Sequence, residues 1–421
     1  MKPKIVIIGG GFAGNNIIRY LDNDKYEVIL VDKNNYTFFP PLLYQVSTGF
    51  LEPSSISYPF RKMLRHKRNL TFKMGELISV DPENNSVTLS TGKLNYDFLI
   101  ISTGTETNYF GMENVEKFSM PMKSLNDAIE LRNYILAKIE EATTFVGEPE
   151  KLYPKLRVVI AGGGPTGVEI SGMLAEMQSS VFRKDYPELN GLKQQDYIYL
   201  IDGASAVLAP MSTKSQQDTK QALEELGVKV ILNTQVKDFD GKKVLLSDGT
   251  TIETENLIWA AGVTAKKFPG LPQEAFGRGG RMKVDAFNRL QNYHNIFAIR
   301  DTCILNGDKN FPDGHPQVAQ VALQQGENLA KNFNKMSGKR QLIPFVYKDK
   351  GSMAIIGRNK AVADLPKQIH FKGFIAWLLW IFVHLMSLVN YRNRVTTFFN
   401  WLTAYFTRDQ ALRMIIRPKK P

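Results

Sequence analysis

The chain has 421 residues, of which 43% are hydrophobic, and it carries a formal net charge of +12. This length predicts two or three domains with substantial hydrophobic cores. Its single cysteine, Cys303, excludes an internal disulfide and a redox-active cysteine pair, because each needs two sulfur atoms. The sequence has no basic helix-turn-helix, zinc-ligand set or RNA-binding motif, so we expect neither a metal site nor a nucleic-acid partner. Because the first strand begins almost at the first residue, we expect no cleaved signal peptide and a cytoplasmic location.

The chain opens with a strand, a glycine-rich turn and a helix. An apolar run at 5–8 leads into Gly9-Gly10-Gly11-Phe12-Ala13-Gly14, and a second strand at 27–32 ends in Asp32. In this arrangement backbone N–H groups and a helix N-terminus hold a pyrophosphate, while the carboxylate accepts hydrogen bonds from ribose hydroxyls. The alternative is an ordinary tight turn, which Asp32 disfavours. The segment therefore predicts a dinucleotide site.

The next segments continue the same kind of fold. A buried strand at 97–101 ends in the small-residue turn Ser102-Thr103-Gly104. A helix is predicted at 125–141, and a proline-bearing linker at 149–154. These elements separate the first dinucleotide unit from a second one.

The second unit repeats the first 153 residues later. The run 158–161 leads into Gly162-Gly163-Gly164-Pro165-Thr166-Gly167, and the strand 198–202 ends in Asp202. The 35 residues from Gly167 to Asp202 exceed the roughly 20 of the simple fingerprint, which predicts an insertion at 181–195. Asp202 could simply be a solvated residue at the end of a strand. If it binds the ribose, we expect the site to prefer NADH, because a carboxylate repels the 2′-phosphate of NADPH. Two dinucleotide sites in one chain indicate an oxidoreductase that uses a flavin and a nicotinamide.

The remaining part of the α/β region yields fewer predictions. The segment 257–262 repeats the strand and small-residue turn of the first unit, and 295–301 is a short strand that ends at Asp301. A helix is predicted at 317–334, followed by strands at 344–347 and 353–356. Cys303 is expected to be a small buried hydrophobic residue.

The last 56 residues, 366–421, carry nine lysines and arginines against one aspartate, so +8 of the net charge lies there. Three of the four tryptophans also lie there, at Trp377, Trp380 and Trp401. A basic segment rich in tryptophan and phenylalanine is typical of an anionic membrane surface.

Two helices are predicted in this tail. Residues 373–389 have only His384 and Ser387 as clearly polar members, and 17 residues of helix span ~25 Å, short of the ~30 Å hydrocarbon core. Residues 395–406 have apolar side chains at helical spacing, flanked by Arg392, Arg394, Arg408, Arg413 and Arg417. A membrane-surface anchor is favoured over a single spanning helix or a dimer interface, although an anchor and a dimer are compatible. His384 is expected to be packed rather than to relay protons.

Taken together, these features resemble the type II NADH:quinone oxidoreductases. The specific pieces are Asn35-Tyr36 with Pro40–Val46, the Ala-Gln-x-Ala-x-Gln pattern within 319–326, the segment 351–358, and the tail pattern from Ala376 to His384. The resemblance covers essentially the whole chain. It implies a fold of class α/β with two Rossmann-like dinucleotide-binding domains, the FAD domain discontinuous, plus C-terminal amphipathic membrane-anchoring helices.

The implied boundaries are 1–115 and 271–365 for the FAD domain, 116–270 for the NADH domain and 366–421 for the anchor. The implied reaction transfers a hydride from NADH to non-covalent FAD, and then two electrons to a membrane quinone, without proton pumping. The resemblance further implies a homodimer of the respiratory chain, peripheral on the cytoplasmic face of a bacterial plasma membrane.

The resemblance also assigns site residues. It places FAD at Gly9, Gly11, Phe12, Ala13, Gly14, Asp32, Lys33, Thr103, Gly104, Asp301 and Ala319. It places NADH at Gly162, Gly164, Pro165, Thr166, Gly167, Glu169, Asp202, Ala261 and Gly262. It places the quinone at Gln320 and Gln324.

Three of these residues have plainer interpretations. Glu169 lies in the first turn of a helix, where a carboxylate interacts with the helix dipole; the resemblance instead makes it catalytic, between nicotinamide and flavin. Gln320 and Gln324 lie four residues apart on one helix face and could form an ordinary polar stripe. As quinone ligands they would donate hydrogen bonds without adding charge to an apolar tunnel.

One residue departs from the family pattern. In the family pattern a glycine directly precedes the flavin-binding aspartate, whereas this chain has Arg300 before Asp301. The arginine could crowd FAD, point outward or reach a phosphate; crowding predicts that Arg300→Gly raises FAD retention. Arg300 is also the only support for an alternative function, a flavin-deficient, membrane-attached binding or redox-sensing module. A dehydrogenase that passes electrons from NADH to a soluble acceptor is the other alternative.

Overall fold

The structure is a computed structural model that describes residues 2–190, 197–305, 308, 311–312, 314–407 and 412–416. The chain forms two compact units, each built from separate stretches of sequence. Unit 1 comprises Met1–Phe38, Tyr58–Glu106 and Val263–Asp349, and unit 2 comprises Phe39–Ser57, Thr107–Gly262 and Lys350–Pro421.

Unit 1 is built on a five-stranded parallel sheet with strand order β21-β9-β1-β2-β5. Its strands are β1 (Lys4–Ile8), β2 (Glu27–Asp32), β5 (Leu70–Met74), β9 (Phe98–Ile101) and β21 (Ile296–Ala298). Residues 5–8 of β1 are at most 2% exposed, because parallel sheets of this kind are covered on both faces. Other elements of unit 1 include α4 (Phe60–Leu64), β6 (Leu77–Asp81), β7 (Ser86–Leu89), β8 (Gly92–Asn95), β20 (Met282–Val284) and β22 (Cys303–Leu305).

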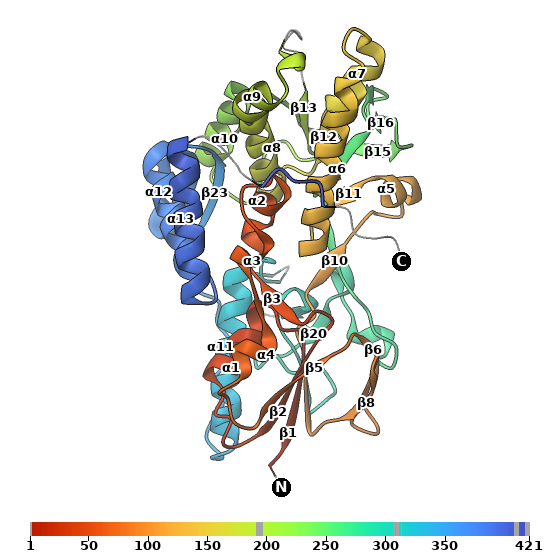
Figure 1. Ribbon diagram of the computed structural model, residues 1–421. Coiled ribbons are helices and arrows are strands. Elements are labelled where there is room, and N and C mark those ends of the chain that lie inside the picture. The colour runs from red at the N-terminus through yellow and green to blue at the C-terminus, as the bar shows by residue number, and fades with distance from the viewer. Residues whose placement is uncertain are drawn as a thin grey trace. The chain divides into compact units, whose positions relative to one another are not determined.

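One helix pair in unit 1 brings together segments 300 residues apart in sequence. Helices α1 (Phe12–Tyr20) and α11 (Ala319–Met336) pack side by side (Figure 1). A Cβ on Gly326 would lie 2.6 Å from the carbonyl oxygen of Ala13, so only glycine permits this approach. Ile17 and Phe333 are fully buried in the same core. This packing fixes the start of α1, which follows the first glycine turn.

Unit 2 repeats the plan with a five-stranded parallel sheet of order β11-β18-β12-β13-β14. Its strands are β11 (Met120–Pro121), β12 (Val158–Ala161), β13 (Ile198–Ile201), β14 (Val228–Ile231) and β18 (Asn256–Trp259). The helices of this unit before the tail are α2 (Leu43–Ser47), α3 (Pro53–Ile56), α5 (Glu113–Phe118), α6 (Leu125–Thr143), α7 (Pro149–Leu156), α8 (Pro165–Met177), α9 (Arg183–Asp185) and α10 (Thr213–Glu225). A small antiparallel sheet is formed by β15 (Val236–Phe239), β16 (Lys243–Leu246) and β17 (Thr251–Glu253). Further short strands of the chain are β3 (Tyr36–Phe38), β4 (Ser57–Pro59), β10 (Thr105–Thr107) and β19 (Val263–Ala265).

The C-terminal tail is part of the core of unit 2. It follows β23 (Ser352–Gly357) and β24 (Lys360–Leu365), which form an antiparallel sheet with β25 (Ile369–Lys372) of the tail. The tail continues as α12 (Gly373–Ser387) and α13 (Tyr391–Thr407). The two helices lie side by side (Figure 1). Trp380 is 1% exposed, and the indole Nε1 of Trp401 donates to Oε1 of Gln45 at 2.7 Å. Over the described part of the chain, no helix combines the length and apolar character needed to cross a membrane.

Several boundaries differ from the sequence expectations. The linker expected at 149–154 is wrong, because Pro149 starts α7 and the buried Leu152 anchors it. The strand expected at 344–347 is also wrong. Phe345 and Tyr347 are buried alternately, but the backbone N–H of Phe345 donates to the carbonyl oxygen of Ala286 outside any strand. The flanking residues Ile343 and Lys348 bond through their backbone to side chains of α11.

Two further expectations concern residues only partly within the structure. The expected insertion at 181–195 begins as short helical turns up to Leu189, and 191–196 lie outside the described residues. Arg408 and Arg417, expected to flank the last helix, also lie outside them.

Candidate active site

The first glycine turn in unit 1 is closed by the aspartate at the end of β2. The backbone N–H of Gly10 donates to Asp32 Oδ2 at 2.7 Å, and that of Asn34 donates to Oδ1 at 2.8 Å. Burial raises the pKa of the Asp32 carboxyl above its ordinary value, although these two N–H groups act in the opposite direction. Gly9 has φ +104°, and a Cβ on Gly14 would lie 2.0 Å from the carbonyl oxygen of Gly9. The turn is thus built so that only glycine fits at both positions.

The turn after β9 lies against the first glycine turn. The Ser102 hydroxyl donates to the carbonyl oxygen of Gly9 at 2.8 Å, and Gly104 has φ +74°. The Oγ1 of Thr103 is buried and has no hydrogen-bond partner among the described residues. An unpaired buried hydroxyl is costly, so this atom suits a ligand that supplies the missing partner.

The other residues that the sequence predicted for FAD lie around the same turn or at its edge. Phe12 and Ala13 start α1, Lys33 is exposed beyond β2, and Ala319 starts α11. Asp301 lies in a short 3₁₀ turn after β21, where its Oδ2 is 3.6 Å from Nε of Arg300.

Gln325 is a residue of this site that the sequence analysis did not single out. It is 2% exposed on α11, and its Oε1 accepts from the backbone N–H of Arg300 at 2.6 Å. Its Nε2 lies 3.7 Å from Sγ of Cys303. Burial raises the pKa of the Cys303 thiol to about 12, so this sulfur is an unreactive protonated thiol. The predicted role of Cys303 as a buried small hydrophobic residue is confirmed.

The second glycine turn, in unit 2, has the same construction as the first. Asp202 at the end of β13 accepts the backbone N–H of Gly163 on Oδ2 and that of Ala204 on Oδ1, the latter at 2.6 Å. A Cβ on Gly167 would lie 1.8 Å from the carbonyl oxygen of Gly162. Around Gly164 the surroundings are open: apart from its own chain neighbours, no heavy atom of the described residues lies within 4 Å of the position that a Cβ would take. Each carboxylate oxygen keeps a second lone pair for a ribose hydroxyl.

The remaining residues predicted for NADH lie at the rim of this turn. Pro165 and Thr166 are exposed at the start of α8, and Ala261 is exposed after β18. A Cβ on Gly262 would lie 2.6 Å from the ring of Phe110. Phe110 itself is 62% exposed and packs edge-on against Trp259.

Glu169 lies on α8 and is 8% exposed. Burial raises the pKa of its carboxyl well above the ordinary value, opposed by a hydrogen bond from the backbone of Ile355. The pKa of the Tyr44 hydroxyl is likewise raised well above its ordinary value, by burial first and by the nearby Glu169 second. The Tyr44 hydroxyl accepts from Nε2 of Gln45 at 2.8 Å.

These groups line a cavity of about 600 Å³ within unit 2. Its walls come from α2, α8, β23 and both tail helices, and they include Tyr44, Gln45, Glu169, Trp380 and Trp401. The wall is mainly apolar, and Glu169, Glu176 and Arg358 are its charged members. An apolar cavity with a few polar groups is typical of a small-molecule site. Tyr44 and Gln45 belong to the Pro40–Val46 segment, but no individual role was predicted for them.

Glu176 at this cavity, and His384 next to the lining residue Trp380, are both held firmly. Glu176 accepts the backbone N–H of Arg358 and has its pKa raised by burial, and the Arg358 guanidinium lies 4.2 Å from the Tyr405 ring centroid. His384 stacks on Trp380 at 3.9 Å, and its Nδ1 donates to the carbonyl oxygen of Trp380 at 2.8 Å. Burial lowers the pKa of His384 to about 4, so it is neutral near pH 7, as expected for a packed histidine.

Gln320 and Gln324 lie on α11 of unit 1. Gln324 donates from Nε2 to the carbonyl oxygen of Lys348 at 2.8 Å and accepts from its N–H at 2.9 Å. Asn332, two turns further along, pairs with Ile343 in the same way. Gln324 therefore helps to replace the missing strand neighbour of residues 343–348. Gln320 contacts Asp349 at 3.5 Å.

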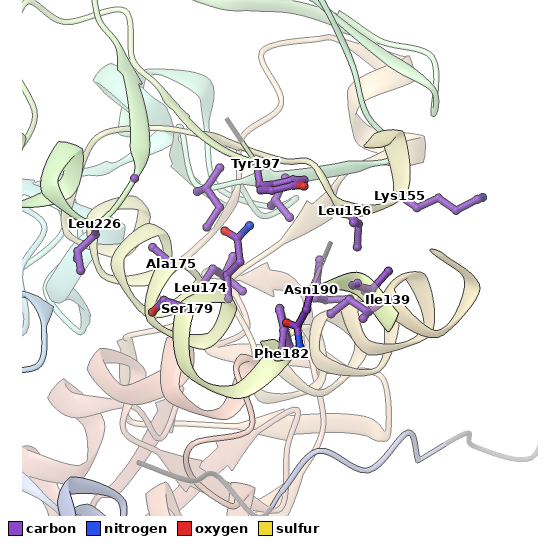
Figure 2. Close-up of a pocket in the computed structure, with 16 residues that line it drawn as sticks. Ile139, Lys155, Leu156, Leu174, Ala175, Ser179, Phe182, Asn190, Tyr197 and Leu226 are labelled. Carbon is purple, nitrogen blue, oxygen red and sulfur yellow. The ribbon is translucent and has the colours of Figure 1, made fainter. Parts of the chain in front are cut away.

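A second cavity, of about 530 Å³, lies elsewhere in unit 2 (Figure 2). Leu174, Phe182, Asn190 and Tyr197 line it, and the lining that the structure describes includes none of the predicted site residues. Lys155 extends away from it in Figure 2, and its Nζ pairs with Glu141 and Glu255. We therefore assign no catalytic role to the described residues of this lining.

Comparisons with known proteins agree across the chain. A family model described as pyridine nucleotide-disulphide oxidoreductase matches residues 3–326, and one described as NDH2 C-terminal domain matches 350–409. A type II NADH:quinone oxidoreductase of Mycobacterium tuberculosis is 34% identical, covering 96% of this chain and 89% of its own length. An internal alternative NAD(P)H-ubiquinone oxidoreductase of Arabidopsis thaliana is 31% identical, covering 97% and 85%.

Solved structures show the same fold. The structure of NDH2 from Plasmodium falciparum in complex with NADH matches with a TM-score of 0.88 at 24% identity, covering 99% of this chain and 100% of that one. A sulfide:quinone oxidoreductase from Aquifex aeolicus matches with a TM-score of 0.72 at 19% identity, covering 97% and 96%.

Proposed function

This chain belongs to the type II NADH:quinone oxidoreductases, and from that premise we propose which of its residues carry the reaction. It is an FAD-dependent enzyme that oxidises NADH and reduces a quinone. The bound FAD supplies the redox chemistry, as hydride acceptor from NADH and two-electron donor to the quinone, while the protein positions the partners. The observation that carries the residue assignment is the pair of glycine turns, one in each compact unit, each closed by an aspartate.

The first turn, in unit 1, is our proposed FAD site. The start of α1 offers backbone N–H groups to a pyrophosphate, and Asp32 offers lone pairs to a ribose. The unpaired Oγ1 of Thr103 and the tight positions of Gly9 and Gly14 fit a cofactor that approaches the backbone closely. Asp301 completes the proposed set.

The second turn, in unit 2, is our proposed NADH site. Its open surroundings at Gly164 leave room for a pyrophosphate. Asp202 orders the turn through Gly163 and would accept the ribose hydroxyls of NADH, which supports a preference for NADH over NADPH. A protonated Glu169 would carry no charge to repel a negative ligand, and it could donate a proton within hydrogen-bond reach.

The cavity between α8 and the tail helices is our proposed entrance for the quinone. A mainly apolar wall suits an apolar quinone, and Tyr44 and Glu169 offer hydroxyl protons to its carbonyl oxygens. We retain Gln320 and Gln324 as proposed quinone ligands. The Gln324 amide keeps one N–H after pairing with Lys348, because a carboxamide has two donors.

Tail helices α12 and α13 form our proposed membrane-binding face. Their exposed residues are predominantly apolar, which is unusual for a surface in water. The most exposed include Ile375 at 62%, Phe382 at 63%, Phe399 at 58% and Phe406 at 74%. Together with the basic tail, this supports peripheral attachment to an anionic membrane, which we place at the cytoplasmic face of a bacterial plasma membrane as part of a respiratory chain. A homodimer is compatible with this arrangement and stays a prediction.

The first experiment is an absorbance spectrum of the purified protein, taken before and after anaerobic NADH and again after a water-soluble quinone. We expect flavin bands that bleach with NADH and return with the quinone. A protein without flavin bands that stays colourless with added FAD would contradict FAD binding at the first turn. Bleaching that a quinone fails to reverse, while a soluble acceptor reverses it, would favour the soluble-acceptor alternative.

A further inference from the structure

Arg300 has a backbone conformation that an arginine rarely adopts. Its φ is +72°, in the left-handed region, where the backbone of a residue other than glycine is strained. Glycine would adopt this conformation without strain. The strain persists because the surrounding structure fixes the backbone, through the hydrogen bond from the Arg300 N–H to the buried Gln325.

This backbone conformation directs the Arg300 side chain onto the first glycine turn. Its Nη1 lies 2.5 Å from the position that a Cβ on Gly11 would take, and 3.1 Å from that of a Cβ on Gly104. The guanidinium therefore covers the surface where a pyrophosphate would meet the start of α1. It does not point outward, which was one of the alternatives left open by the sequence.

The second glycine turn provides an internal comparison. Gly164 occupies the same place in its motif as Gly11, and apart from its chain neighbours no heavy atom of the described residues lies within 4 Å of its Cβ position. The two turns otherwise share the aspartate closure and the buried last glycine. The cation thus distinguishes the first turn from the second.

The terminal nitrogens of the Arg300 guanidinium are available for a ligand. The Nε lies 3.6 Å from Asp301 Oδ2, a long ion pair, and the side chain is 17% exposed. No hydrogen bond joins either Nη atom to a described residue, and the carboxylates that the guanidinium faces are Asp301 and Asp32, whose pKa the charge of Arg300 acts to lower. A largely buried cation with free donors is costly unless an anion neutralises it.

We propose that Arg300 is a further FAD-binding residue, whose guanidinium donates hydrogen bonds to the FAD pyrophosphate at the first glycine turn. A guanidinium binds phosphate oxygens in a bidentate manner and adds a full charge to the partial charges of the helix N-terminus. This proposal rests on the proposed FAD site in unit 1. It reverses the crowding expectation, because loss of Arg300 should weaken FAD binding even where it relieves backbone strain.

The test compares FAD dissociation from purified holoenzymes, followed as the rise of flavin fluorescence after dilution. The variants are Arg300→Ala, Arg300→Gly and Arg300→Lys. The control is Arg19→Ala, which removes an exposed cation at the opposite end of α1. A variant that purifies without flavin is titrated with FAD, and its dissociation constant is compared with that of deflavinated wild type.

We expect Arg300→Ala and Arg300→Gly to weaken FAD binding by about tenfold to a hundredfold, the range for a charged hydrogen bond. Arg300→Lys should retain part of the affinity, and Arg19→Ala should behave as wild type. The salt dependence of FAD dissociation should be shallower in Arg300→Ala than in wild type, because one charged contact is gone.

The glycine variant separates strain from charge. Arg300→Gly should raise the melting temperature of the flavin-free protein relative to Arg300→Ala, and yet bind FAD as weakly. If both variants bind FAD as tightly as wild type, the guanidinium contributes nothing to FAD binding, and if they bind it more tightly, the guanidinium crowds the site. Either result makes the Arg300 proposal wrong, while FAD binding at the first turn still holds. A wild-type protein that binds no FAD would overturn that site assignment and this proposal together.

Discussion

At the residue scale, Glu169 is an acid held away from water without an ion pair to any described residue. A carboxyl in such surroundings is stable in its protonated form, because burial raises its pKa well above the ordinary value. A neutral acid close to the Tyr44 hydroxyl could store a proton for a substrate that takes up protons along with electrons. The cavity that both residues line makes this a local property of unit 2.

The raised pKa of Glu169 predicts a pH-dependent stability. Above the unfolded pKa of roughly 4.5, the unfolded chain releases this proton first, so the free energy of unfolding falls as the pH rises toward the folded pKa. Each pKa unit between the folded and the unfolded state of Glu169 changes the free energy of unfolding by about 1.4 kcal/mol. Glu169→Gln should flatten the decline of the melting temperature between about pH 5 and pH 8, whereas the exposed Glu116→Gln should not. Parallel profiles for wild type and Glu169→Gln would contradict a buried neutral acid.

Asp202 predicts how the enzyme selects its nicotinamide. Asp202→Asn removes the negative charge while keeping an oxygen for the N–H of Gly163. We expect the ratio of kcat/KM for NADH to that for NADPH to fall about tenfold or more, since the repulsion of the 2′-phosphate is relieved. Steady-state rates with both nucleotides measure this. Asp240→Asn, which changes a loop aspartate of the same unit, is the matched control. If the ratio of kcat/KM for NADH to that for NADPH stays unchanged in Asp202→Asn, then Asp202 does not bind the ribose.

At the element scale, one glycine sets the distance between α8 and β23. A Cβ on Gly172 would lie 1.7 Å from the carbonyl oxygen of Ile356, closer than any side chain allows. The helix that carries Glu169 and the strand that bonds to it are therefore in direct backbone contact. This contact fixes one wall of the apolar cavity.

Gly172→Ala should consequently destabilise unit 2 by about 1–3 kcal/mol, the range for overpacking. The sign of this change in the free energy of unfolding is informative, because replacing glycine by alanine inside a helix ordinarily stabilises a protein by about 0.5–1 kcal/mol. Gly338→Ala, whose Cβ would meet only ordinary contacts at 3.6 Å or more, is the control. Chemical denaturation with fluorescence detection measures both, and a stabilised Gly172→Ala protein would contradict the close packing.

At the scale of the whole molecule, the tail serves two purposes. Its inner side completes the core of unit 2 through Ala376, Trp380 and Trp401, and its outer side is apolar and exposed. Deleting 366–421 would therefore expose that core, and loss of activity would not separate anchoring from folding. Point variants on the outer side avoid this problem.

A triple variant, Ile375→Glu, Phe382→Glu and Phe399→Glu, should abolish most binding to anionic lipid vesicles, because it places three negative charges on the proposed membrane face. The melting temperature should change little, since the three side chains are more than half exposed. Co-sedimentation with phosphatidylglycerol vesicles measures binding, and NADH oxidation with a water-soluble quinone should persist. Unchanged vesicle binding would exclude this face as the anchor.

The family and the two glycine turns with their aspartates could be predicted from the amino-acid sequence. Those features are encoded locally, because a strand, a tight turn and a helix follow one another within about 30 residues. The α/β class and the family are confirmed by the comparisons, whereas the roles of individual site residues stay predictions.

The contacts between residues far apart in the chain could not be predicted in this way and came from the folded structure. Gln45 and Trp401 bond across 356 positions, and the cavity beside Glu169 is completed by the tail helices. The direction of the Arg300 side chain depended on its φ and on the hydrogen bond to Gln325, and neither is encoded in the local pattern. Contacts of this kind arise from long-range packing, and no periodicity or motif along the chain specifies them.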